Sequence, residues 1–293
     1  MFEYTWSAYP MTDPSTTKPL DYLLIGHVTE DINPDGSKKI GGTASFSGLT
    51  AMALGNNVGI LTSCRPDLSL EPLNGLELYV VPSEVNTTFR NIHTATGRLQ
   101  YMYQRAAMLD QSNLPESLKQ ARIVHLGPVA SEIDPDIFTQ FPKSLICLTP
   151  QGWLRGFAED GRVSAIAWPF SPDLLKAAHA TVLSIDDVRG DETQVEQLAS
   201  LCRLLVVTEN QDGARVFWNG DVRRFSAPRV TVLEDTGAGD IFAACFFHRL
   251  HETQDPWEAA RFAVQLSSAS VTRSYYDSIP TPFEIARAKT QIL

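Results

Sequence analysis

Short runs of Val, Ile and Leu alternate with amphipathic segments along this 293-residue chain, and this rhythm restricts the folds that it can adopt. The runs lack polar alternation, which is typical of strands covered on both faces. The segments between them have helical spacing. Such alternation predicts an α/β fold with a mostly parallel central sheet, right-handed crossovers and helices on both faces. The expected strands are 21–26, 57–64, 121–129, 144–150, 180–185 and 204–210, and the expected helices are 44–55, 171–179, 191–201, 238–251, 256–272 and 282–292.

One segment interrupts this rhythm. Residues 87–106 resemble two strands joined at the sequence TATG, and in the second strand Leu99, Tyr101 and Tyr103 alternate with polar residues. A hairpin inserted early in a parallel α/β protein predicts a small β lid over a ligand site. The alternative is a hairpin that covers a sheet edge and has no ligand role.

Composition excludes several classes of function. The net charge of −10 argues against nucleic acid as the main partner. No apolar run reaches membrane-spanning length, so no membrane partner is expected. Residues 1–19 lack the features of a signal peptide and are interpreted as an irregular leader before a single domain at 20–293. Four dispersed cysteines in apolar surroundings are expected to be buried free thiols, which favours a cytoplasmic protein; they are Cys64, Cys147, Cys202 and Cys245.

The sequence DTGAGD directly precedes an apolar helical run. The backbone N–H groups of Gly237, Ala238, Gly239 and Asp240 would then lie at a helix N-terminus, where small residues and the helix dipole favour a bound phosphate. A carboxylate beside a phosphate is repulsive unless it acts, and Asp240 could take a proton from a hydroxyl that attacks this phosphate. The alternative is that Asp240 only caps the helix above a tight glycine turn.

The stretch EDTGAGDIFAACFF resembles the C-terminal signature of the ribokinase-like, or pfkB-type, carbohydrate and nucleoside kinases. IGHVTEDI and KIGGTASFSG are similar to the N-terminal signature of that family. GRLQYMY, VHLGPV, LTPQGWLR, LVVTENQDGARVF and IPTPFEI follow in the order of the family. The resemblance covers about residues 20–285 and implies a three-layer sandwich with a small β lid.

The resemblance also implies residue roles. Asp240 matches the general base, and Gly237, Ala238 and Gly239 match the anion hole. The residues matched to acceptor binding are Asp31, Gly41 and Gly42, because carboxylates accept hydroxyl hydrogen bonds and glycines allow close approach. Thr208 and Gly213 match the nucleotide loop. Asp187 takes the place of a family Glu linked to the magnesium-bearing phosphates, or else is a solvated acid at a helix start.

Five departures from the family pattern limit what the resemblance implies. Glu234 takes the expected place of an Asp before the signature, with Asp235 following, so dependence on a monovalent cation is left open. Phe46 replaces an Asn that often contacts sugar, which suggests a less polar or differently shaped alcohol. Ser184 and Asn210 replace a family Asn and a family Gly. The short span between Asp31 and Gly41 predicts a reduced pair of lid strands.

The resemblance therefore implies a phosphotransferase that uses ATP and Mg²⁺ to phosphorylate a hydroxyl, expected to be a primary alcohol, of a sugar or polyol. A nucleoside kinase is the second reading. A ligand-binding protein that retains the fold without turnover is the third, and the intact run from Gly237 to Asp240 argues against it. The resemblance allows a homodimer, but the residues do not fix the oligomeric state.

Overall fold

Nine strands form the central sheet of the computed structural model, which describes residues 19–94 and 97–290. The strand order is β15-β14-β13-β12-β9-β8-β1-β4-β5. Neighbouring strands from β13 to β5 are parallel, whereas β14 and β15 are added antiparallel at one edge. The predicted leader falls almost wholly outside the described residues, as do residues 95–96 of the predicted hairpin junction and residues 291–292 of the last predicted helix.

The bounds of the elements follow in chain order. The strands are β1 (Tyr22–Ile25), β2 (Thr29–Ile32), β3 (Lys38–Gly41), β4 (Val58–Cys64), β5 (Glu77–Pro82), β6 (Thr87–Thr94), β7 (Gly97–Gln104), β8 (Ile123–Leu126), β9 (Leu145–Leu148), β10 (Arg155–Phe157), β11 (Val163–Ala165), β12 (Ala180–Ser184), β13 (Leu204–Thr208), β14 (Ala214–Trp218) and β15 (Asp221–Phe225). The helices are α1 (Thr43–Ala53), α2 (Pro172–Ala177), α3 (Glu192–Leu201), α4 (Ala238–Thr253), α5 (Pro256–Ser270) and α6 (Pro282–Thr290), and short 3₁₀ helices include η6 (Ile185–Val188), η7 (Asn210–Asp212) and η8 (Tyr275–Ser278).

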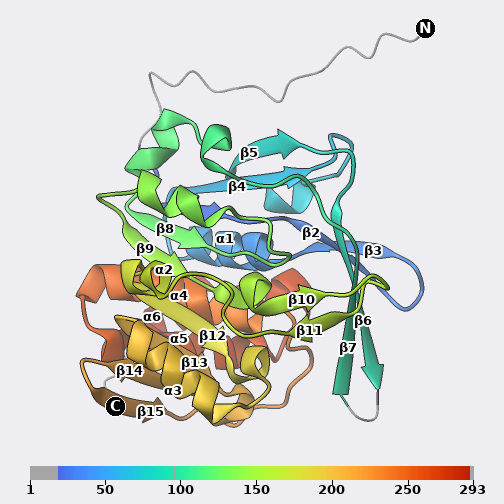
Figure 1. Cartoon of the computed structure of the whole chain (residues 1–293). Coiled ribbons are helices and arrows are strands. Elements are labelled where there is room, and N and C mark those ends of the chain that lie inside the picture. Colours follow the sequence, from blue (N-terminus) through green and yellow to red (C-terminus); the bar gives the residue numbers. More distant parts are fainter. Residues whose placement is uncertain (1–18, 95–96, 291–293) are drawn as a thin grey trace, which may run out of the picture.

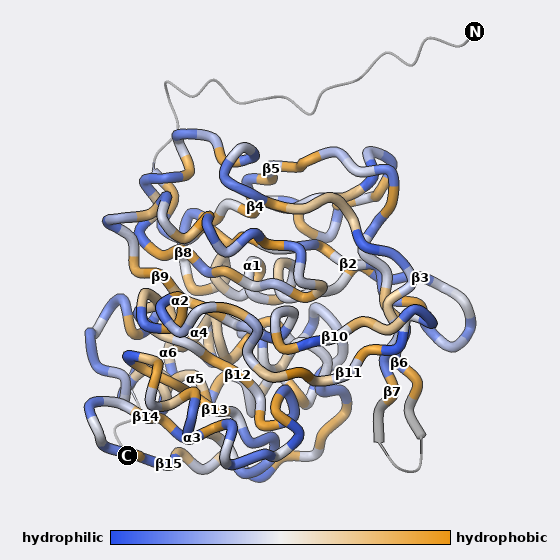
Figure 2. Tube along the Cα trace, in the orientation of Figure 1, coloured by the Kyte–Doolittle hydropathy of each residue, from blue (hydrophilic) through white to orange (hydrophobic). Residues whose placement is uncertain are grey.

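Both faces of the sheet are covered, which produces the three layers (Figure 1). Successive residues of β1 point to opposite faces, so Leu24 packs in the core beneath α1, α4 and α5, while Leu23 packs in the core beneath α2 and α3. Because the strands are buried on both faces in this way, their sequences are apolar without polar alternation. In Figure 2 the hydrophilic segments lie mainly at the periphery. In the described part of the chain, no helix combines the length and apolar character needed to cross a membrane.

A second sheet of four strands, in the order β3-β2-β6-β7, projects from the body beside the carboxyl ends of the central strands (Figure 1). The predicted hairpin supplies β6 and β7. The strands β2 and β3 are the pair that the sequence predicted to be reduced. Each has four residues, and Asp31 lies opposite Lys39. Because β2 pairs in parallel with β6, Asp31 also lies opposite Phe89. We call this four-stranded sheet the lid.

His27 holds the base of the lid. Its ring Nδ1 lies 2.6 Å from the Thr87 hydroxyl, where β6 begins, and its Nε2 donates to the Ala107 carbonyl at 2.8 Å, just after β7. Burial lowers the pKa of His27, so the neutral ring is favoured. The Glu132 carboxylate accepts the His27 backbone N–H at 3.0 Å. Hydrogen bonds from both the backbone and the ring of His27 thus hold the chain where it crosses between body and lid.

Candidate active site

The start of α4 has the geometry expected of an anion site. Gly237 caps the helix with φ of +81°, a left-handed conformation that favours glycine. Ala238 already uses its N–H to donate to the Asp235 carbonyl at 3.1 Å. The N–H groups of Gly239 and Asp240 make no backbone hydrogen bond to the described residues, and nothing described lies within 4 Å of a Cβ built on Gly239. Gly239 and Asp240 therefore keep N–H donors that no described backbone carbonyl accepts, whereas the N–H of Ala238, also part of the predicted anion hole, is already paired.

The Phe46 side chain packs against this turn. It is only 1% exposed, and a Cβ on Gly237 would lie 2.3 Å from the Phe46 ring. The ring also packs edge-on against Tyr275, with centroids 6.0 Å apart. A side chain enclosed in this way offers almost no surface to an acceptor, so Phe46 does not support a direct contact with the alcohol. A less polar or differently shaped alcohol stays a prediction from the sequence. The sequence position alone did not reveal that this residue of α1 faces the core.

Asp240 lies in the first turn of α4, where its Oδ1 accepts a hydrogen bond from the Thr43 hydroxyl at 2.7 Å. Burial raises the pKa of Asp240 to about 6, although the Thr43 bond and the charge of Arg155 oppose that rise. The carboxylates of Asp187 and Asp31 act in the same direction as burial. A carboxyl group with such a pKa is mostly ionised at neutral pH and able to accept a proton.

The acceptor residues predicted from the sequence meet at the base of the lid. A Cβ on Gly41 would lie 2.4 Å from the Asp31 Oδ2, so this glycine makes room for the carboxylate. Gly42 has φ of +84° and forms the N-cap of α1, which brings Thr43 to Asp240. The Asp31 Oδ1 also lies 3.4 Å from the Thr29 hydroxyl. Asp31 from the lid and Asp240 from the body are therefore close enough for their charges to interact.

Asp187 lies in η6, at the carboxyl end of β12. Its Oδ2 accepts the Ser184 N–H at 2.9 Å, while the Ser184 hydroxyl accepts the Asp186 N–H at 3.2 Å, so Ser184 and Asp187 cap this turn reciprocally. The Asp187 Oδ1 is 3.4 Å from the Gln151 amide. Burial raises the pKa of Asp187. The reading of Asp187 as a solvated acid is corrected, because the residue caps a helix start but is partly buried. Its link to magnesium-bearing phosphates stays a prediction.

The predicted nucleotide loop follows β13. The Thr208 hydroxyl donates to the Leu183 carbonyl at 3.4 Å, which ties the end of β13 to β12. Gly213 has φ of +97°, and a Cβ there would lie 1.9 Å from the Phe225 carbonyl oxygen. This glycine is required by the close approach of β15, irrespective of any ligand. Asn210 has φ of +51°, a conformation that Asn tolerates, which explains how it can replace a glycine.

Glu234 and the two tyrosines of η8 form hydrogen bonds next to the candidate site. The Glu234 Oε2 accepts the Tyr275 N–H at 3.2 Å. The hydroxyls of Tyr275 and Tyr276 both donate to the Ile40 carbonyl, the latter at 3.0 Å, and so hold the end of β3 against the α4 side of the site. No cluster of three or more His, Cys, Asp or Glu side chains arranged to hold a metal occurs among residues 19–94 and 97–290.

Thr43 and Arg155 were not singled out by the sequence analysis, and both contribute to the site. Thr43 directly follows the Gly-Gly pair, and this adjacency was the only signal for it. Arg155 ends the stretch LTPQGWLR, and its charge lowers the pKa of both Asp240 and Asp187. The chain folds Arg155 close to these acids through β10, a strand that the apolar pattern did not reveal.

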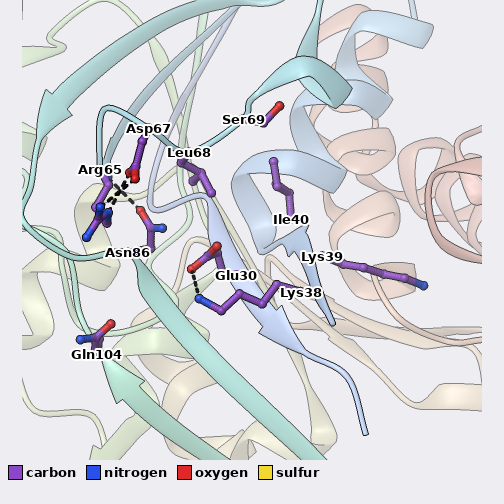
Figure 3. A pocket seen from close by; sticks show the side chains of 10 residues that line it. All are labelled: Glu30, Lys38, Lys39, Ile40, Arg65, Asp67, Leu68, Ser69, Asn86 and Gln104. Carbon is purple, nitrogen blue, oxygen red and sulfur yellow. Dashed lines mark hydrogen bonds and ion pairs between the residues drawn. The ribbon is translucent and has the colours of Figure 1, made fainter. Parts of the chain in front are cut away.

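Two cavities lie near the lid, and one of them borders the site. A cavity of about 600 Å³ is lined by Arg155, Asp186 and Asp187, together with Leu99 and Gln100 of β7. The second, of about 470 Å³, lies between the lid strands and the loop after β4 (Figure 3). Two of its three cations form ion pairs, Lys38 with Glu30 and Arg65 with Asp67, whereas Lys39 lies over the ring of Tyr275. None of the predicted site residues lines this cavity.

Comparison with known proteins identifies the family of the chain. Residues 75–282 match the pfkB family of carbohydrate kinases. The chain belongs to this family. An inositol 3-kinase of Zea mays is 27% identical over 120 residues, which make up 40% of this chain and 31% of the maize protein, so the match spans less than a third of that relative.

Solved structures share the fold. A pyrophosphate-dependent kinase of the ribokinase family, solved with a pyrophosphate analogue and myo-inositol, has a TM-score of 0.77 at 20% identity and covers 91% of this chain and 99% of that one. Ribokinase from Arabidopsis thaliana, solved with ribose and ATP, has a TM-score of 0.70 at 16% identity and covers 94% of this chain and 100% of that one. The predicted ribokinase-like sandwich is confirmed, and membership of the pfkB family supports the prediction of a kinase.

Proposed function

We propose that this pfkB-family kinase transfers the terminal phosphoryl group of ATP to a hydroxyl of a sugar or cyclic polyol. The observation that carries the proposal is the position of the Asp240 carboxylate, beside the N–H groups at the start of α4 and within electrostatic reach of Asp31 on the lid. Myo-inositol is the first acceptor to test, because the maize relative is an inositol 3-kinase and a structural neighbour was solved with myo-inositol. Its hydroxyls are secondary, unlike the primary alcohol expected from the sequence.

In the proposed step Asp240 accepts the proton of the acceptor hydroxyl. The hydroxyl oxygen forms a bond to the terminal phosphorus as the bond to the bridging oxygen breaks, and ADP leaves with that electron pair. The N–H groups of Gly239 and Asp240 donate to the oxygens of the transferred group. Asp31 and the backbone at Gly42 orient the acceptor, which reduces the entropy that must be lost in the transition state.

Magnesium fits the residues that the site offers. Mg²⁺ is usually bound by one or two carboxylates plus phosphate oxygens and waters, so a three-carboxylate cluster is not required. Asp187 is the proposed ligand, through the oxygen near Gln151 that is free of the capping bond. The bound ion would neutralise negative charge on the donor phosphates. Thr208 and Gly213 are proposed to border the nucleotide.

The decisive assay measures ADP and orthophosphate release separately, with ATP or pyrophosphate offered as donor. The acceptor panel contains myo-inositol, other polyols, free sugars and nucleosides, and the product is identified by mass spectrometry. We expect acceptor-dependent ADP release with a polyol or sugar. Turnover with pyrophosphate alone would overturn the choice of donor, turnover with nucleosides alone would support the nucleoside-kinase reading, and binding without turnover would support the third reading. A single domain over 20–293, a cytoplasmic location and a homodimer stay predictions from the sequence.

A further inference from the structure

Arg155 occupies the junction between the body, the lid and the hairpin formed by β10 and β11. Its Nη1 donates to the carbonyl of Val129, in the loop after β8, at 3.1 Å. Its guanidinium carbon lies 5.8 Å from the ring centre of Phe89, on lid strand β6. Arg155 also lines the 600 Å³ cavity that Asp187 borders. One half-buried guanidinium therefore contacts both sides of the cleft between lid and body.

The hairpin that carries Arg155 is attached to the lid. In its turn, the Gly161 carbonyl accepts a hydrogen bond of 2.8 Å from the Met102 N–H of β7. Tyr101 of β7 also forms an antiparallel bridge with Arg162. Phe157 and Val163 of the hairpin join a small apolar cluster with Phe89, Met102, Val129 and Ala130. The hairpin is therefore packed between β7 and the loop after β8, so a movement of β7 would act on it directly.

The site is rich in negative charge before any substrate binds. Around Asp240 the charged groups are Arg155 from β10, Asp187 from η6 and Asp31 from β2, and the Thr43 hydroxyl of α1 is its hydrogen-bond donor. A donor phosphate chain would add further negative charge. Phosphoryl transfer depends on neutralising the charge on the equatorial oxygens, and a planar guanidinium can bind two of them at once.

We propose that Arg155 binds the phosphoryl group during transfer, and that the β10–β11 hairpin places it there when the lid closes over the acceptor. The inference rests on the proposed kinase function. Asp240 still takes the hydroxyl proton, the new bond joins the acceptor oxygen to phosphorus, and the leaving diphosphate takes the electrons of the broken bond. Arg155 changes no protonation state and supplies only charge and direction. Closure on the acceptor would thereby be coupled to completion of the transfer site.

Arg155→Met and Arg155→Lys test the contact. We expect Arg155→Met to lower kcat by about 10²–10³, the usual effect of removing one transition-state donor. It should also move the acid limb of the kcat/KM profile upward by roughly one pH unit, because a cation that favours the Asp240 carboxylate is lost. Arg155→Lys should keep the limb near its parental pH while kcat falls about tenfold, since bidentate contact is lost.

Gly161→Ala tests the attachment, and Gly220→Ala is its matched control. Both glycines have φ of +82°, so both variants incur the same backbone strain. A Cβ on Gly161 would lie 2.5 Å from the Met102 carbonyl oxygen, whereas nothing described lies within 4 Å of a Cβ on Gly220. We expect Gly161→Ala to raise the acceptor KM several-fold and to move the acid limb in the same direction as Arg155→Met. Gly220→Ala should leave both unchanged.

The outcomes separate this inference from the proposed function. Absence of acceptor-dependent turnover in the parent protein would refute the proposed function itself. An active parent with Arg155→Met kinetics and acid limb unchanged, at an unchanged melting temperature, would refute the role of Arg155. A lower melting temperature with kcat and the limb unchanged would assign Arg155 to structure and also overturn the inference. Kinetics of Gly161→Ala equal to those of Gly220→Ala would refute delivery by the hairpin.

Discussion

The hydrogen bond from Thr43 to Asp240 offers a quantitative test of the general base. Thr43→Val replaces the hydroxyl by a methyl group of similar size at a position that is only 3% exposed. The 2.7 Å bond favours the charged carboxylate, and hydrogen bonds to charged groups contribute roughly 1.5–3 kcal/mol. Since one pKa unit corresponds to about 1.4 kcal/mol, losing the bond should raise the pKa of Asp240 by roughly one to two units.

The sign of the effect follows from the role of Asp240 as a base. Activity is lost as pH falls through the pKa of the base, so the acid limb of kcat/KM is expected near pH 6 in the parent. In Thr43→Val the limb should move to roughly pH 7–8. The plateau above it should stay within a few-fold, because the base itself is retained. The assay is kcat/KM for the acceptor from about pH 5 to about pH 9 with saturating donor.

Ser47→Ala is the matched control for this measurement. The Ser47 hydroxyl donates to the backbone carbonyl of Asp240 at 2.9 Å, so its loss removes a bond to the same residue without touching the carboxylate. Stability should fall by about 1 kcal/mol while the acid limb stays in place. An unmoved limb in a folded Thr43→Val protein, or an equal movement in Ser47→Ala, would refute the assignment of Asp240 as the titrating base.

Three further substitutions test other parts of the site. Asp240→Asn keeps the size of the side chain but cannot take a proton, so kcat should fall by about 10²–10⁴ at an unchanged melting temperature. Turnover within a few-fold of the parent in steady-state assays would assign Asp240 to structure, through its bond with Thr43. Asp31→Ala should raise the acceptor KM by about tenfold to 150-fold, because a charge-assisted hydrogen bond to the acceptor is lost, while the donor KM stays nearly constant. Unchanged acceptor kinetics would assign Asp31 to structure. Gly237 has φ of +81°, and an added Cβ would lie 2.3 Å from the Phe46 ring, so Gly237→Ala should lower both kcat and the melting temperature. Gly55→Ala is the control: Gly55 has φ of +92° with nothing described within 4 Å of an added Cβ, so only the melting temperature should fall. Equal kinetics of the two variants would contradict a role for the Gly237 turn.

The sequence by itself determined the layers of the body and the start of α4. Buried parallel strands must be apolar on both faces, and this requirement is visible as uninterrupted runs such as residues 204–208. Glycines before an apolar helix are likewise visible, because Gly237 and Gly239 are costly unless a turn or a ligand needs them. The predicted free thiols are confirmed, with Cys202 partly exposed and the other three buried.

Only the tertiary structure decided which side chains face the site. Phe46 and Thr43 lie three residues apart on α1, yet one is buried beneath Gly237 and the other bonds Asp240, a difference set by how α1 packs against α4. Asp31 belongs to the lid because β2 pairs with β6, more than fifty residues away, and four-residue strands leave too weak a periodic signal to be read locally. Arg155 reaches the acids through a hairpin docked on β7. Contacts of this kind depend on the packing of distant segments, which local sequence does not encode.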